Sequence, residues 1–193
     1  MSSLVMDFRK LFVLMSVLVT TRCEDFVTES DAVRYTCFGW EFSVNCGSLT
    51  WEDARQACKN DGFDDLATIR SAEMLSDIHK FVDENGWTKA NCHGGAMWIG
   101  YYDPDTTNAI PHTEADFQWL STDTCAKYVE WEAGNPNDNT KKNATGQSCT
   151  DLWLSKNGLY DDNYCTRKRG YICEKLIRHD CGDDCGCNGS CFA

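Results

Sequence analysis

The chain has 193 residues, 13 of them cysteine, and a formal net charge of −12 at pH 7. This length suits one domain with short appendages and is large enough for a hydrophobic core. The acidic balance argues against a nucleic-acid partner, because phosphates need a basic surface. So many cysteines without a metal-site pattern predict disulfide bonds, and therefore an exported chain.

Residues 1–23 have the features of a secretory signal peptide. Arg9 and Lys10 precede an apolar run, residues 11–19, which is too short to span a membrane, and no later run reaches that length. Cleavage after Cys23 would leave an even number of cysteines, whereas cleavage after Thr21 would leave Cys23 as an odd thiol. The cysteine count favours cleavage after Cys23, which leaves residues 24–34 as a short N-terminal segment.

Two helices are predicted in the first half of the chain. Thr50 is expected to cap the first, with Asp53 as the capping-box acid, and Gly62 to end it. Ser71 is expected to cap the second, which stops at Gly86. Apolar residues at helical spacing indicate its core-facing stripe: Met74, Leu75, Ile78, Phe81 and Val82. Residues 37–46 predict a short hairpin closed by its own disulfide, and residues 66–69 a short strand.

From Trp98 onward helical periodicity disappears. Short aromatic-rich segments divided by turn residues predict strands and structured loops over residues 98–102, 117–119, 128–131, 149–154 and 170–174. Two helices followed by such strands indicate an α+β domain. Residues 177–193 form a Cys-rich tail of different composition. Its cysteines pair among themselves or between chains, and a Cys₄ zinc site is the alternative.

The most unusual stretch is the polar loop that begins at residue 131. Asn135-Pro136-Asn137 places a proline between two amides, where the X–Pro bond can be cis. Asp161 and Asp162 supply two adjacent carboxylates further along. Oxygen ligands gathered on a cross-linked loop are what calcium requires.

Taken in order, these features resemble a C-type lectin-like domain over residues 35–176, in the form with an extra N-terminal hairpin. The resemblance covers most of the exported chain and is carried by Cys37, Trp40, Cys46, Trp51, Ala54, Cys58, Leu66-Ala67-Thr68-Ile69, Ser71, Glu73, Trp98-Ile99-Gly100, Phe117-Gln118-Trp119, Tyr128, Trp131, Gly134-Asn135-Pro136-Asn137, Cys149, Cys165 and Ile172-Cys173-Glu174. It implies a disulfide-stapled α+β fold, with two helices, short antiparallel sheets and a long calcium-binding loop region.

The resemblance also implies which cysteines pair. The family pattern gives Cys37–Cys46, Cys58–Cys173 and Cys149–Cys165. Cys92 and Cys125 fall outside the common set, and their pairing with each other is a further candidate.

In sugar-binding members of this family, calcium and two vicinal sugar hydroxyls share one set of side chains. Mapped onto this sequence, the calcium ligands are Asn135, Asn137, Gln147, Asp161 and Asp162, and the carbohydrate-binding residues are Asn135, Asn137, Gln147 and Asp161. The formal charge of the set is about −2, where the usual set carries about −3, so a weaker site is expected. The motif is neither the mannose-type Glu-Pro-Asn nor the galactose-type Gln-Pro-Asp, although Asn137 slightly favours mannose-type sugars.

These features predict a secreted, non-enzymatic glycoprotein that binds terminal sugars through Ca²⁺, in innate defence or in cell or matrix recognition. The expected partners are glycans, and the tail cysteines could link copies into a homo-oligomer. Asn143 and Asn188 lie in glycosylation sequons. The alternative is a calcium-independent protein of the same fold that binds protein or mineral. Asp103 and Asp138 match the family's auxiliary calcium position, but Gln147 and Ser148 replace acids there.

Overall fold

The computed structural model describes residues 14–15, 22–26, 34–84, 95–105, 111–123, 125, 127–139, 141, 146–153, 156 and 158–181, with side chains described from residue 39 to residue 177. Cys92, both sequons and the tail beyond Cys181 therefore lie outside the described residues. Within them the helices are α1 (Trp51–Asn60) and α2 (Ala72–Glu84), with a 3-10 turn at Glu114–Asp116. No helix among these residues is long and apolar enough to cross a membrane.

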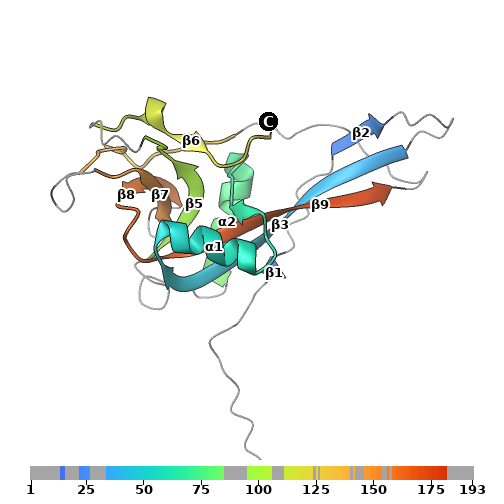
Figure 1. Cartoon of the computed structure of the whole chain (residues 1–193), viewed down its shortest axis with the longest axis horizontal. Coiled ribbons are helices and arrows are strands. Elements are labelled where there is room, and N and C mark those ends of the chain that lie inside the picture. Colours follow the sequence, from blue (N-terminus) through green and yellow to red (C-terminus); the bar gives the residue numbers. More distant parts are fainter. Residues whose placement is uncertain are drawn as a thin grey trace, which may run out of the picture.

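The described strands form one sheet, shown in Figure 1. They are β1 (Leu14–Met15), β2 (Arg22–Phe26), β3 (Arg34–Leu49), β4 (Asp65–Leu66), β5 (Ala96–Tyr102), β6 (Gln118–Trp119), β7 (Cys149–Trp153), β8 (Leu159–Asn163) and β9 (Arg169–Cys181). The order is β1-β3-β9-β5-β7-β8, with β2 on β3, β4 on β9 and β6 on β5. All pairs are antiparallel except β5 with β9.

The predicted hairpin over residues 37–46 is wrong. These residues lie in one continuous strand, β3, whose successive residues from Tyr35 to Asn45 pair with β9. Nine residues of extended chain span about 30 Å, far more than the ~4.4–6.8 Å between Cα atoms that a disulfide allows. The Cys37–Cys46 bond is therefore excluded, although Cys46 is disulfide-bonded.

Two predicted disulfides are present. Cys58 on α1 bonds to Cys173 on β9, and Cys149 at the start of β7 bonds to Cys165 beyond β8. The candidate pairing of Cys92 with Cys125 stays a prediction, because Cys92 lies outside the described residues. The two bonds fix α1 to the first half of β9 and close the hairpin formed by β7 and β8.

Both helices begin where the sequence predicts, because a side chain satisfies an N–H of the first turn. Thr50 Oγ1 accepts from the N–H of Asp53 at 3.3 Å, and Ser71 Oγ accepts from the N–H of Met74 at 3.1 Å. The apolar stripe of α2 is buried as predicted, at Met74, Leu75, Ile78 and Val82, and packs against the sheet. A second core cluster forms beneath α1 around Trp51, Trp98 and the Cys58–Cys173 bond.

Gly100 on β5 lies where two segments meet closely. Its N–H donates to the carbonyl of Ala67 at 2.9 Å, and a Cβ at this position would lie 2.8 Å from the carbonyl oxygen of Leu66. Only a glycine therefore allows the segment after β4 to pack onto β5. This contact anchors β5, which in turn positions β7 and β8 at the edge of the sheet.

Candidate functional site

The segment before the proline loop runs beside β8 and brings the loop to that strand. Trp131 forms a parallel bridge with Tyr160, and the N–H of Glu132 donates to the Tyr160 carbonyl at 2.9 Å. A turn follows, closed by a 2.9 Å bond from the N–H of Asn135 to the Glu132 carbonyl. Gly134 occupies this turn at φ 93°, a conformation that favours glycine. The turn places Asn135, whose bond to Pro136 is cis, beside the middle of β8.

A chain of amide hydrogen bonds links the proline loop to β8. The side-chain amide of Asn137 donates to Asn135 Oδ1, and Asn135 Nδ2 in turn donates to Asp161 Oδ1 at 2.7 Å. Three of the predicted ligands therefore lie in direct contact. Asn135 and Asp161 are partly buried, whereas Asn137 is exposed, so this group reaches the surface.

Asp162 points to the opposite face of β8, as alternation along a strand requires. Its side chain is fully buried and accepts from two loop N–H groups, that of Asn137 at 2.9 Å and that of Asp138 at 2.7 Å. Burial raises the pKa of Asp162, and the two N–H donors oppose that rise. The carboxylate thus holds the loop against β8 through the loop's backbone.

A third carboxylate, which the sequence analysis did not single out, lies beside Asp161. Asp151 on β7 is fully buried, and its Oδ2 accepts from Arg169 Nε at 2.8 Å. Burial raises the pKa of Asp161 to about 7, and the negative charges of Asp151 and Asp162 add to the rise. In the sequence, Asp151 could have been found from its position two residues after Cys149, because residues two apart in a strand lie on the same face.

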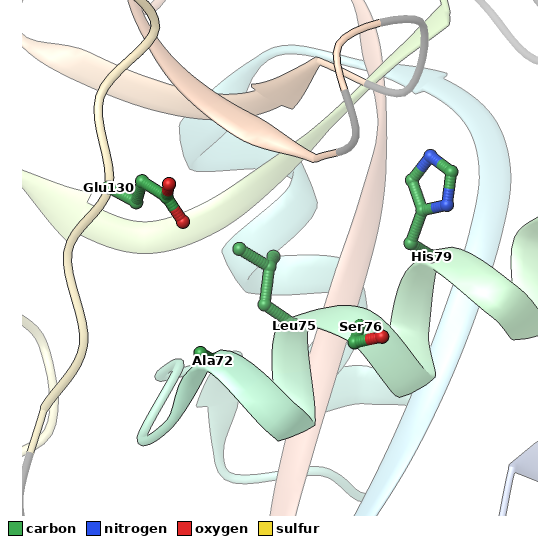
Figure 2. A pocket seen from close by; sticks show the side chains of 5 residues that line it. All are labelled: Ala72, Leu75, Ser76, His79 and Glu130. Atoms are coloured by element: carbon green, nitrogen blue, oxygen red, sulfur yellow. The ribbon is translucent and has the colours of Figure 1, made fainter.

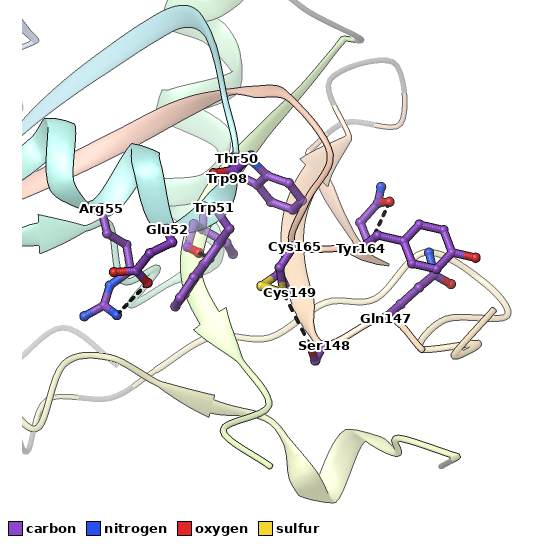
Figure 3. The surroundings of a disulfide bond; sticks show 12 residues. Thr50, Trp51, Glu52, Arg55, Trp98, Gln147, Ser148, Cys149, Tyr164 and Cys165 are labelled. Carbon is purple, nitrogen blue, oxygen red and sulfur yellow. Dashed lines mark hydrogen bonds and ion pairs between the residues drawn. A yellow bond between two sulfur atoms is a disulfide. The ribbon is translucent and has the colours of Figure 1, made fainter. Parts of the chain in front are cut away.

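Gln147 lies beside Asp162, but its amide serves the loop backbone. Its Oε1 accepts from the N–H of Asn139 at 2.6 Å, and its Nε2 donates to the Asp162 carbonyl at 2.8 Å. The residue is 6% exposed. Figure 3 shows Gln147 next to Ser148 and the Cys149–Cys165 disulfide that fixes this part of the chain. The structure thus brings together Asn135, Asn137, Asp161 and Asp162, and gives both polar atoms of Gln147 backbone partners.

A buried polar group supports the loop from the other side. Asp138, at φ 41°, accepts from the N–H of Gln147 at 2.9 Å and from the N–H of His112 at 2.9 Å. The His112 ring bonds to Asp103 through its Nδ1. Gly146 fits here because a Cβ would lie 2.8 Å from the His112 ring and would overlap Asp138. The spacing of His112 in the sequence matches no metal-binding or catalytic motif.

The donor atoms of these residues decide whether the group could hold calcium. No group of three His, Cys, Asp or Glu side chains in the described part of the chain is placed to hold a metal, so a cation would rely on amide oxygens as well. Asn135, Asn137, Asp161 and Asp162 supply amide and carboxylate oxygens, the donors that calcium prefers. Burial, together with the negative charges of Asp151 and Asp162, raises the pKa of Asp161. These four residues fit a hard cation.

A separate surface hollow lies on α2. It is lined by Ala72, Leu75, Ser76, His79 and Glu130, with a volume of about 300 Å³. Figure 2 shows the side chain of Glu130 facing this helix from the neighbouring segment. None of the predicted site residues lines it, so it is distinct from the loop site.

Sequence comparison relates the chain to a known family. The model of the Lectin C-type domain family matches residues 47–175. Hepatic lectin of Gallus gallus is 33% identical over 82 residues, 42% of this chain and 33% of that protein. Salivary C-type lectin 2 of Aedes albopictus is 25% identical over 175 residues, 86% of this chain and 97% of that protein. The chain spans about a third of the length of hepatic lectin and of rat L-selectin, at 33% and 32%.

Solved structures share the fold. Human lithostathine superposes with a TM-score of 0.55 at 22% identity, over 72% of this chain and 84% of that one. The carbohydrate-recognition domain of the mouse scavenger receptor C-type lectin gives 0.51 at 22% identity, over 79% and 94%. Herring type II antifreeze protein gives 0.50 at 22% identity, over 74% and 91%.

The fold and the disulfides are therefore those of a C-type lectin-like domain. Because the family model matches more than half of the chain, this protein belongs to the C-type lectin domain family.

Proposed function

We propose that this protein is a secreted glycan-binding lectin that uses calcium, held by Asn135, Asn137, Asp161 and Asp162. The observation that carries the proposal is the contact chain from Asn137 through Asn135 to Asp161, which gathers amide and carboxylate oxygens at an accessible edge. When bound, calcium supplies coordination positions for two neighbouring sugar hydroxyls. The amides of Asn135 and Asn137 can both donate to and accept from those hydroxyls, whereas Asp161 accepts only.

The charge distribution supports a cation at this place. Asp161 has a pKa of about 7 because burial and the charges of Asp151 and Asp162 penalise its ionised form. A divalent cation would offset that repulsion. The four residues carry only two carboxylates, so we expect weak calcium binding. Weak single sites are consistent with copies of the chain linked through the tail cysteines to raise avidity.

Export and sugar recognition are supported by independent features. The two disulfides at Cys58–Cys173 and Cys149–Cys165 suit an oxidising compartment, and the predicted signal peptide would deliver the chain there. Relatives named as hepatic and salivary lectins and a neighbour named as a carbohydrate-recognition domain favour glycans as ligands. Asn137 slightly favours mannose-type sugars, and roles in innate defence or in cell and matrix recognition follow from such a ligand.

The test is retention of the secreted protein on mannose and galactose columns in calcium buffer, followed by elution with a chelator. Retention that the chelator reverses supports the proposal and identifies the sugar class. Flow-through on both columns, together with no binding on a wider glycan array and no calcium uptake in a direct titration, would overturn it.

A second candidate is a calcium-independent protein of the same fold that binds protein or mineral. It is favoured by the internal bonds of the loop, which already pair the Asn135 amide with Asp161 and the Gln147 amide with backbone groups. A neighbour named as an antifreeze protein shows that the fold is not restricted to proteins named as lectins. The single change Asp161→Ala separates the two, because it removes a proposed ligand and leaves the Asp162 bonds that hold the loop in place. It abolishes ligand binding under the first proposal and leaves it nearly unchanged under the second.

A further inference from the structure

We infer that Gln147 closes the binding loop without calcium, so that the site is assembled before any ion binds. This inference deepens the proposed function and rests on it. Its evidence, however, lies in contacts between this chain's own residues. It assigns Gln147 as a positioning residue, in contrast to the ligand role that the family resemblance implies.

The amide of Gln147 joins two segments that are far apart along the loop. Its Oε1 accepts from the N–H of Asn139 at 2.6 Å, on the proline side of the loop. Its Nε2 donates to the carbonyl of Asp162 at 2.8 Å, on β8. Gln147 is 6% exposed. Its bond to Asp162 is buried and its bond to Asn139 is partly buried, so breaking the bond to Asp162 would leave buried polar groups unsatisfied.

The chemistry of the two partners requires an amide at this position. A backbone N–H can only donate and a backbone carbonyl can only accept, so the orientation of the Gln147 amide is fixed. A glutamate of the same size could accept from Asn139, but its second oxygen would face the Asp162 carbonyl without a proton between them. Such a pair of oxygens needs a cation to bridge it. Gln147 provides the bridge with an N–H.

Two neighbouring carboxylates complete the closure of the loop. Asp162 accepts from the N–H groups of Asn137 and Asp138, and Asp138 accepts from the N–H of Gln147. Together with the Gln147 bond to Asn139, side chains thus accept from the N–H groups of four loop residues, 137, 138, 139 and 147. Both carboxylates are less than a tenth exposed, at 0% for Asp162 and 7% for Asp138. The two described ends of the loop, residues 135–139 and 146–148, are thus tied to β8 and to each other without an ion.

The test follows amide hydrogen exchange at residues 137, 138, 139 and 147, first in chelator and then in calcium. We expect these amides to be protected in chelator in the unmodified protein, with little change on adding calcium. Gln147→Glu should exchange about tenfold faster in chelator, as loss of one buried hydrogen bond predicts, and calcium should restore its protection. Gln147→Met removes both bonds without adding charge, so its amides should exchange faster with or without calcium.

Gln56→Glu is the matched control, because it makes the same charge change on the exposed face of α1. It should exchange at these four amides like the unmodified protein. The inference is overturned if the unmodified loop exchanges rapidly in chelator and slows only in calcium, or if both Gln147 variants keep full protection in chelator. If the four amides are protected in chelator but the protein binds no sugar, only the proposed function is contradicted. If the protein binds sugar but the four amides are unprotected in chelator, only this inference is contradicted.

Discussion

Asp151 and Asp161 face each other in register across β7 and β8, and the side-chain amide of Asn163 donates to both, at 3.0 Å and 3.3 Å. Their surroundings differ. Asp151 is fully buried and bonded to Arg169, whereas Asp161 is partly exposed and bonded to Asn135. Asp151 is thus bound within the sheet, whereas Asp161 belongs to the proposed binding site.

Asp161→Asn and Asp151→Asn should therefore separate binding from stability. Asp161→Asn removes one of only two ligand carboxylates, so chelator-reversible retention on sugar columns should weaken about tenfold or more, with no loss of folding stability. Asp151→Asn leaves Arg169, whose side chain is 14% exposed, without its ionic partner, and should cost about 3 kcal/mol. Urea unfolding and column retention measure both effects. Equal loss of stability in the two variants would contradict this division, and Asp83→Asn on the exposed end of α2 is the charge control.

The Arg55–Asp65 pair should give a pH-dependent contribution to stability. Arg55 Nε and Nη2 donate to the two oxygens of Asp65 at 3.0 and 2.9 Å. Burial opposes the shift, but hydrogen bonds from Arg55 and from the N–H of Leu66 lower the pKa of Asp65. A lowered folded-state pKa stabilises above the unfolded value, about 3.9, and this stabilisation is lost as the pH falls through the folded value.

Asp65→Asn should therefore cost about 1–2 kcal/mol at pH 7, and the difference from the unmodified protein should shrink to near zero at about pH 2. Urea titrations at a series of pH values measure it. A difference that stays constant down to that pH would show that the charge of Asp65 is not the cause.

Gly100→Ala should destabilise the sheet by about 1–3 kcal/mol, because the new Cβ would lie 2.8 Å from the Leu66 carbonyl oxygen. Gly39→Ala on β3 is the matched control, since a Cβ there has no atom within 4 Å. It should leave the free energy of unfolding unchanged or slightly raised. If both variants lose the same stability, the close approach of the two segments is not what requires a glycine at position 100.

The two disulfides should contribute unequally to stability. Cys58–Cys173 joins residues 115 apart in sequence and Cys149–Cys165 joins residues 16 apart. The chain-entropy relation then gives roughly 5 and 3 kcal/mol for the two bonds. Paired Cys→Ala variants, compared by urea unfolding under oxidising conditions, should rank in that order. The reverse ranking would show that local contacts around Cys149 outweigh chain entropy.

The sequence predicted best what is decided locally. Thr50 and Ser71 cap their helices through side chains that reach only three residues ahead, and the stripe of α2 follows from spacing alone. The hairpin at residues 37–46 failed because β3 is extended by its pairing with β9, more than a hundred residues away. No local pattern in Cys37 to Cys46 records that partner.

The candidate site was predicted through family resemblance more than through physics. Proximity of Asn135 to Asp161 depends on the bridge between Trp131 and Tyr160, which no spacing reveals. The bonds of Gln147 depend on which backbone groups meet its amide, and those are set by the folded loop. His112 joins the loop's support only because folding brings Asp103 and Asp138 to it.

The long ribbon of β3 and β9 separates the two ends of the domain. Tyr35 and Cys181 are opposite one another at the ribbon's far end, while β7 and β8 lie at the other end of the molecule in Figure 1. The paired ends of β3 and β9 therefore lie at one end of the described part of the chain, and β8, which Asn135 contacts through Asp161, lies at the other. A ligand at the candidate site would therefore meet the domain at the end away from the paired ends of β3 and β9.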